Sequence, residues 1–222
     1  MTDTAVGSVW DDVVGQAAAV DRLRAAAARG AVHSYMFVGP AGSTKLEAAR
    51  AFASVLLVGD DGRELRDSRL VAQGAHPDVH EIRRVGAAIS AEQARQIAST
   101  ATRSPVESDR KILILDEFHL INPDAAATLL KTIEEPSAST TFLILADTVP
   151  DELVTIASRS VVVEFRAIPD ELVATKLVTE GISPGAATAA AAAAYGDLDR
   201  ARLLATDGAL SARRALFTGA PH

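Results

Sequence analysis

A glycine-containing segment that ends in a lysine is the strongest chemical signal in the chain. Residues 37–46 read FVGPAGSTKL, between an apolar run and an alanine-rich stretch. This order of strand, loop and helix is the context of the phosphate-binding motif G-x-x-x-x-G-K-[ST]. Backbone amides of such a loop hold phosphate oxygens, and the lysine neutralises them. We therefore predict a phosphate site of this ancestry, with the candidate residues Gly39, Gly42, Ser43, Thr44, Lys45 and Leu46.

Two residues of this loop depart from the motif. Thr44 stands where the motif has glycine, and its side chain crowds the space that a phosphate approaches. Leu46 replaces the hydroxyl residue that ligates magnesium, and leucine offers no oxygen. We therefore expect impaired metal-assisted hydrolysis. Weak binding of ATP and magnesium stays open, because the amides and Lys45 remain; a purely structural strand–turn–helix corner is the alternative.

A pair of acidic residues further along the chain extends the nucleotide-hydrolysis pattern. Asp116 and Glu117 directly follow the apolar run KILIL. In ATPases with such a loop the first acid positions magnesium and the second activates the attacking water. The alternative is a buried strand that ends in ordinary acids at the surface. We predict that Asp116 and Glu117 are the catalytic acids, or their vestige if the loop has lost its nucleotide.

The elements that must position these residues alternate as in a parallel α/β sheet. Runs that are apolar on both faces predict helices on both sides of that sheet. The predicted strands are Ser34–Val38, Val79–Ile82, Lys111–Leu115, Thr141–Ala146 and Val161–Phe165. The predicted helices lie near residues 17–29, 45–57, 90–101, 124–134 and 151–157. Ser90 with Gln93 forms a predicted capping box, and Pro123 after Asn122 marks another helix start.

The pattern changes after Phe165. Residues 169–222 contain no convincing strand, and glycines divide them into short helical segments. One of these segments, residues 186–194, is rich in alanine and has a high helix propensity. We therefore predict a nucleotide-binding-type α/β domain over residues 1–167 and a small helical domain over residues 168–222.

Composition restricts the classes of function. Of the 222 residues, 48% are hydrophobic and 23% charged, which is typical of a soluble folded protein. The absence of cysteine excludes disulfides, thiolate zinc sites and cysteine nucleophiles. A net charge of −7 disfavours tight DNA binding by the chain alone. We find no signal peptide or apolar run of about 20 residues, and no metal-like spacing of the five histidines. We therefore expect a cytoplasmic chain without a metal site.

Several motifs together resemble the bacterial clamp-loader subunits of the AAA+ ATPase superfamily. In chain order they are DVVGQ (12–16), HSY (33–35), GAHPD (74–78), DEFHL (116–120), AAATLLKTIEEP (125–136), VTIASRS (154–160) and GDLDRA (196–201). They extend over nearly the whole chain in the family's order. The resemblance implies a five-stranded parallel sheet with a helical lid. It also implies membership of a pentamer that opens the ring-shaped sliding clamp and places it on primed DNA.

The resemblance assigns roles to single residues. Arg159 matches the arginine finger, which reaches into the ATP site of a neighbouring subunit; the alternative is an ordinary surface arginine. A guanidinium suits this role because it presents a rigid set of donors to phosphate oxygens. Arg200 lies in the segment that resembles the family's second-sensor helix. It either approaches a phosphate from the lid or has a structural role. Asp147 and Thr148 both stand at the first-sensor position, and the sequence does not choose between them.

Within the family, the damaged loop resembles the delta-prime type, which keeps the fold and the finger but has lost ATP turnover. We therefore expect a DNA polymerase III clamp-loader component, inactive as an ATPase, that acts in DNA replication. The implied partners are gamma/tau-like and delta-like subunits, with the sliding clamp and primed DNA contacted through the complex and no membrane. A weak gamma/tau-like ATPase is the alternative, and a stand-alone DNA-binding protein is a third class.

Two departures from the family carry further expectations. The family's four-cysteine zinc module is replaced by residues 59–70, which contain no cysteine, so we predict no zinc. Without a metal, this interval must be held by helix formation and packing, or stay mobile. The chain also ends soon after the second-sensor region. We therefore expect the C-terminal collar domain, which holds the family's pentamer together, to be absent, either because the sequence is a piece of a longer protein or because this version is naturally short.

Overall fold

The computed structural model describes residues 7–59, 62 and 65–206, and their contacts divide the chain into two compact units. The sheet unit consists of the residues up to Val13, Ala17–Gly39 and Lys45–Phe165. The helical unit consists of Val14–Gln16, Pro40–Thr44 and the residues from Arg166 onward. Residues 207–222 of the predicted helical domain, and residues 60–61 and 63–64 of the predicted metal-free interval, lie outside the described residues.

The sheet unit is built on a five-stranded sheet in which every pairing is parallel. Its strands are β1 (Ser34–Val38), β2 (Val79–Ile82), β3 (Lys111–Leu115), β4 (Thr140–Ala146) and β5 (Val161–Glu164). Their order across the sheet is β2-β3-β4-β1-β5. The predicted strands agree with these bounds to within one residue, and the predicted parallel α/β fold is confirmed. Because the strands are parallel, all their carboxyl ends lie at one edge of the sheet.

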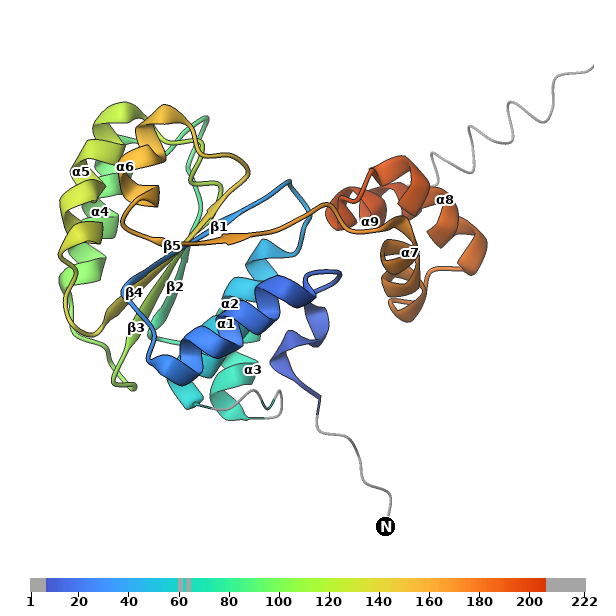
Figure 1. Cartoon of the computed structure of the whole chain (residues 1–222), viewed down its shortest axis with the longest axis horizontal. Helices are drawn as coiled ribbons and strands as arrows, with labels where there is room; N and C mark the ends of the chain where they lie inside the picture. Colours follow the sequence, from blue (N-terminus) through green and yellow to red (C-terminus); the bar gives the residue numbers. More distant parts are fainter. Residues whose placement is uncertain (1–6, 60–61, 63–64, 207–222) are drawn as a thin grey trace, which may run out of the picture. The chain divides into compact units, whose positions relative to one another are not determined.

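Helices cover both faces of this sheet, as the apolar strands predicted (Figure 1). The helical elements of the unit are η1 (Val9–Asp12), α1 (Ala17–Arg29), α2 (Lys45–Val58), α3 (Arg66–Ala72), α4 (Ala91–Thr102), α5 (Pro123–Glu134), η2 (Asp151–Leu153) and α6 (Val154–Ala157). In Figure 1, α1, α2 and α3 lie on one face and α4, α5 and α6 on the other. Side chains alternate along β1 accordingly: Tyr35 and Phe37 face the first layer, and Met36 faces the second.

One predicted helix needs correction, and one helix was missed. The segment 151–157 is not one helix but the 3-10 turn η2 followed by the four-residue α6. Leu153 N donates to Pro150 O, which is three residues earlier in the chain. This spacing is that of a 3-10 helix, whereas an α-helix joins residues four apart. Helix α3 was not predicted at all. It is only seven residues long, and Ser68 and Val71 are its buried positions, so it shows little apolar periodicity.

The capping box predicted at Ser90 forms only in part. Ser90 Oγ accepts a hydrogen bond from Gln93 N at 3.2 Å, as expected. The Gln93 side chain turns elsewhere: its Nε2 donates to Arg83 O at 2.6 Å, and its Oε1 accepts from Val85 N at 3.2 Å. Gln93 therefore fixes the segment that follows β2 instead of closing the box.

The helical unit contains α7 (Asp170–Thr179), α8 (Pro184–Ala194) and α9 (Leu198–Thr206). The alanine-rich segment forms α8, and four of its alanines are buried against Val173 and Leu177 of α7 and Leu198 of α9. Small side chains let these helices approach closely. Gln16 joins the unit through a reciprocal pair of hydrogen bonds with the backbone of Arg166, at 2.7 and 3.1 Å. Among the described residues, no helix has the length and apolarity that a membrane span requires.

Asp78 links β2 to the loop that leads into β3. Its carboxylate is fully buried and accepts hydrogen bonds from three backbone amides, those of Val106, Glu107 and Ser108. Burial raises the pKa of Asp78, but these three donors favour the charged form and outweigh the burial, so its pKa lies below the ordinary value. The folded pKa is lower than the unfolded one. The stabilisation is therefore present above the unfolded pKa, about 3.9, and is lost as the pH falls through the folded value.

Replacing this carboxylate should reveal its contribution. We expect Asp78→Asn to lower the free energy of unfolding at pH 7 by about 1.5–3 kcal/mol, because an amide cannot accept from all three donors. Urea unfolding at pH 7 and near pH 3 measures this, and the difference between the two proteins should shrink at the lower pH. Asp109→Asn, at an exposed carboxylate nearby, is the control. An equal loss for both variants, or a difference independent of pH, would contradict the role.

Candidate functional site

The predicted phosphate loop connects β1 to α2, and its two ends are fixed by the sheet unit. Gly39 N donates to Ala146 O at 3.2 Å. A Cβ atom at Gly39 would lie 2.3 Å from the backbone oxygen of Phe165, so only glycine fits there without movement. At the other end, Leu46 packs against the apolar core of the sheet unit and offers no oxygen to a metal. The loop thus leaves the sheet as the motif predicts, but the position of the expected magnesium ligand is apolar.

Thr44 keeps a backbone conformation that favours glycine. Its φ is 59°, close to the 63° of Gly42. A β-branched residue is rare in this left-handed region, and holding it there costs of the order of 1–3 kcal/mol. The side chain is buried, with Oγ1 3.4 Å from Val14 O. The loop therefore retains the shape of the motif although the glycine is gone.

Lys45 is satisfied by the protein itself. Its Nζ donates to Gly39 O at 2.5 Å and to Asp147 Oδ1 at 3.0 Å, and the side chain is only 9% exposed. Asp147 N in turn donates to His119 Nδ1 at 3.1 Å. Of the two first-sensor candidates, Asp147 is therefore the one that contacts the loop lysine. A phosphate at this position would have to compete with a carboxylate for Lys45.

The predicted catalytic acids are paired with two arginines that sequence reasoning missed. Arg83 Nε lies 2.8 Å from Asp116 Oδ2, and Arg84 Nε lies 3.0 Å from Glu117 Oε2. Arg83 and Arg84 directly follow β2, which is the neighbour of β3 in the sheet. Two basic residues after one parallel strand and two acids after its neighbour would have been a usable signal, because carboxyl ends of neighbouring parallel strands meet.

Glu117 is held in an unusual geometry. Its φ is 51°, again in the left-handed region, and its backbone N–H donates to Asp116 Oδ1 at 2.9 Å. Gln93 anchors the backbone that carries Arg83 and Arg84. The acids and the arginines are thus positioned by β3, β2 and α4 together. A magnesium ion bound here would first have to displace the two arginine side chains from their carboxylates.

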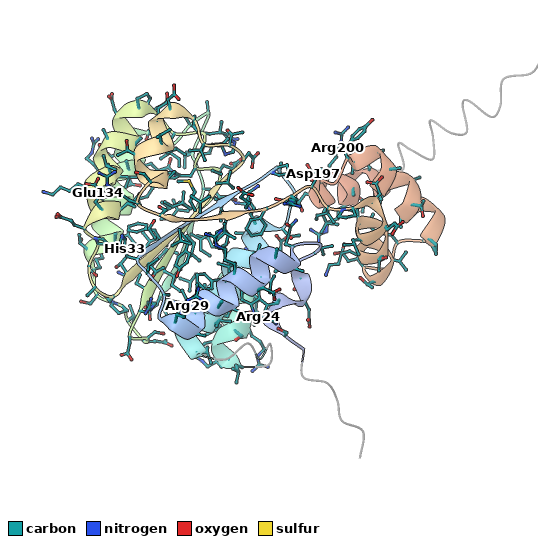
Figure 2. All side chains as sticks on the ribbon, in the orientation of Figure 1. Arg24, Arg29, His33, Glu134, Asp197 and Arg200 are labelled. Atoms are coloured by element: carbon teal, nitrogen blue, oxygen red, sulfur yellow. The ribbon has the colours of Figure 1, made fainter. Side chains whose placement is uncertain are left out.

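In the helical unit, the start of α9 lies against the middle of the loop. Leu198 N donates to Gly42 O at 3.1 Å. A Cβ atom at Gly42 would lie 1.9 Å from Asp197 Oδ1, which shows how closely this carboxylate approaches the loop. Figure 2 shows Asp197 and Arg200 near the start of this helix. A carboxylate beside a phosphate loop repels a bound phosphate, so Asp197 acts against the function that the motif predicts.

Arg200, the second-sensor candidate, engages its own helical unit. Its backbone N–H donates to Asp197 Oδ1 at 2.9 Å, and its guanidinium lies 5.8 Å from the centre of the Tyr195 ring. Tyr195 has a φ of 55° and a largely exposed ring. The geometry is that of a cation–π contact at a surface. Such a contact favours the structural alternative for Arg200.

Arg159 lies apart from the other charged residues. It lies in the short segment between α6 and β5, two residues before β5 begins, and so at the amino edge of the parallel sheet. Lys45, Glu117 and Asp147 follow the carboxyl ends of β1, β3 and β4, at the opposite edge. Arg159 therefore cannot complete the charge cluster of its own sheet. Its guanidinium forms an ion pair with Glu134 and donates to Thr155 O at 3.1 Å.

The sheet order, the loop after β1 and the acids after β3 define the AAA+ fold. Solved structures with the same fold include a DNA polymerase III gamma subunit-related protein of Thermotoga maritima. It is 19% identical, with a TM-score of 0.56, and the match covers 83% of this chain and 57% of that one. The RuvB Holliday junction branch migration motor of the same organism is 20% identical, with a TM-score of 0.56 and coverages of 90% and 63%.

Sequence comparison gives the family. Residues 15–169 match the family model described as "DNA polymerase III, delta subunit", and the chain belongs to the DNA polymerase III delta-prime subunit family. DNA polymerase III subunit delta' of Bacillus subtilis is 28% identical over 156 residues, covering 68% of this chain and 47% of the relative. The Pseudomonas aeruginosa subunit delta' is 34% identical over 137 residues, with coverages of 58% and 42%.

A related subunit type is also similar. DNA polymerase III subunit tau of Bacillus subtilis is 30% identical over 175 residues, covering 76% of this chain and 31% of the relative. The chain thus spans less than half the length of these curated relatives. The predicted relationship to delta-prime subunits is confirmed, whereas the roles of the individual site residues stay predictions.

The internal pairing of Lys45 leads to a test of stability. We expect Lys45→Met to lower the free energy of unfolding by about 1–3 kcal/mol, because it removes two contacts and leaves Asp147 without its cation. In a loop that awaits a phosphate, the same change would be neutral or stabilising. Urea unfolding measures the effect, and a double-mutant cycle with Asp147→Asn should give a coupling of about 1 kcal/mol. Lys131→Met, at an exposed lysine of α5, is the control; a loss no larger than the control's would contradict the pairing.

Proposed function

We propose that this chain is a delta-prime-like subunit of the replicative clamp loader that does not itself turn over ATP. One observation carries the proposal. At the carboxyl edge of the sheet, the cations Lys45, Arg83 and Arg84 each contact one of the carboxylates Asp147, Asp116 and Glu117. A nucleotide–magnesium complex needs the lysine for phosphate and the acids for the metal. Here the lysine and the acids already contact other side chains of the protein, so they are not free to bind phosphate and metal.

Three further features support the loss of hydrolysis. Leu46 supplies no hydroxyl for magnesium. Thr44 fills the position where a phosphate approaches a glycine most closely. In the helical unit, Asp197 places a negative charge beside Gly42. The features are independent of one another, so reversing one of them would not rebuild the site.

Arg159 supports a role in trans, because it lies at the sheet edge opposite to the charge cluster. We propose that it acts as an arginine finger at the ATP site of a neighbouring gamma/tau-like subunit. A delta-like subunit would be a second neighbour, and the sliding clamp and primed DNA would be contacted through the complex, in the cytoplasm. We further propose that residues 1–167 and 168–222 correspond to the AAA+ core and its lid.

A weak gamma/tau-like ATPase is the second candidate. It is favoured by the presence of Lys45, Asp116 and Glu117 and by the similarity to tau subunits. This candidate requires the internal ion pairs to open when ATP and magnesium arrive. Opening the Lys45–Asp147 pair, whose lysine is only 9% exposed, carries an energetic cost that binding must offset, whereas the Arg83–Asp116 pair, with Arg83 63% exposed, costs less to open.

Calorimetry with ATP, with and without magnesium, separates the two candidates. We expect no binding of ATP to the purified chain tighter than about 1 mM, which corresponds to about −4 kcal/mol. The double variant Thr44→Gly with Leu46→Thr should still fail to hydrolyse ATP, because the acids remain paired with arginines. Turnover of the unmodified chain at ordinary ATPase rates, about 1 per second or faster, would establish the second candidate instead.

The trans role of Arg159 is tested in the reconstituted loader. We expect Arg159→Ala to leave folding intact, because the side chain is 46% exposed, and to lower ATP turnover of the complex by about tenfold or more. Arg159→Lys should recover little, since an ammonium lacks the two-pronged donor geometry. Turnover equal to that of the unmodified complex would refute the finger.

A further inference from the structure

The guanidinium of Arg159 is held on two of its three nitrogens. Nε forms an ion pair with Glu134 Oε1. Nη1 donates to Thr155 O at 3.1 Å and to Ser158 Oγ at 3.2 Å. The two hydrogen bonds use both hydrogens of Nη1, and the ion pair places Glu134 beside Nε. Within the described part of the chain, Nη2 is the nitrogen that has no such contact, so its two hydrogens are available to an acceptor from outside.

The residues that hold the guanidinium are themselves anchored. Glu134 lies in the last turn of α5 (Figure 2), directly after Ile133, which is fully buried. Thr155 belongs to α6, whose Ile156 is also buried. Both helices therefore have fixed backbones at the points where they meet Arg159. The side-chain contacts come from two separate elements, which restricts rotation of a long side chain more than contacts from one element would.

The ion pair contributes little to the stability of the fold. The side chains of Arg159 and Glu134 are 46% and 30% exposed, and ion pairs at such positions are weak because water competes for both partners. Glu134 also neutralises the positive charge that would attract a phosphate. An interaction that stabilises the fold little and reduces the charge can still act by fixing geometry.

We propose that Glu134 is a positioning residue for the arginine finger, a role that rests on the proposed function of Arg159 in trans. By holding Nε, Glu134 orients the plane of the guanidinium so that Nη2 points outward before the neighbouring subunit arrives. The rotamer freedom of the arginine is then lost in advance and not during the reaction. The opposite possibility is a latch, in which Glu134 withholds Arg159 until it is released. Removing the Glu134 charge should lower ATP turnover if Glu134 positions the finger, and should raise it if Glu134 is a latch.

The test uses ATP turnover by the reconstituted complex with its sliding clamp and primed DNA. We expect Glu134→Gln, which keeps the size but removes the charge, to lower kcat about fivefold or more and to change KM for ATP less than twofold. Glu134→Asp should recover part of the loss, because it restores a carboxylate. Glu135→Gln is the matched control: it removes the same charge one residue away, at an exposed position after α5. It should change kcat less than twofold.

A second background separates positioning from a general structural effect. In a complex that carries Arg159→Ala, Glu134→Gln should cause no further loss, because the group that it positions is gone. An equal loss in both backgrounds would overturn the proposal, and so would an unchanged or raised kcat for Glu134→Gln in the unmodified background. If Arg159→Ala itself has no effect, the finger fails, and the positioning role fails with it. The proposal is supported if Arg159→Ala lowers turnover and Glu134→Gln lowers kcat only in the complex that retains Arg159.

Discussion

The parallel sheet collects the carboxyl ends of its strands at one edge, and six charged side chains are thereby brought together. Lys45 follows the loop after β1, Arg83 and Arg84 follow β2, Asp116 and Glu117 follow β3, and Asp147 follows β4. Parallel topology allows no other arrangement, since every strand must leave the sheet on that side. The Lys45 side chain is only 9% exposed and needs a partner, whereas the Arg83 side chain is 63% exposed and largely solvated. Each of the three cations nevertheless lies beside a carboxylate of a neighbouring strand end.

The same topology separates Arg159 from that edge. A residue that precedes a parallel strand lies at the amino edge, a full strand length away from residues that follow one. The two functional proposals therefore concern different surfaces of the sheet unit. One surface carries charges that pair with one another, and the other carries the Arg159 guanidinium, whose Nη2 makes no contact within the described part of the chain.

Most of the fold could be predicted from the sequence, because the runs SYMFV, KILIL and TFLILA are apolar on both faces and only a helix-covered parallel sheet buries both. The loop and the acids could also be predicted, since their spacing along the chain carries the signal. The ion pairs could not. They join residues far apart in sequence, such as Lys45 with Asp147, and their formation depends on which strands are neighbours. Short elements such as α3 and α6 were missed or misjudged because seven or four residues contain too little periodicity.

The left-handed backbone of Thr44 has a consequence for how this loop could change over time. The loop conformation persists with a residue that disfavours it, so the surrounding fold, and not the local residue, determines it. A return to glycine at this position would therefore meet no structural barrier. The arginine pairs are different, because each would leave a stranded carboxylate if removed alone. Rebuilding a magnesium site would therefore need changes at Arg83 and Arg84 in addition to those at Thr44 and Leu46, which no single substitution supplies.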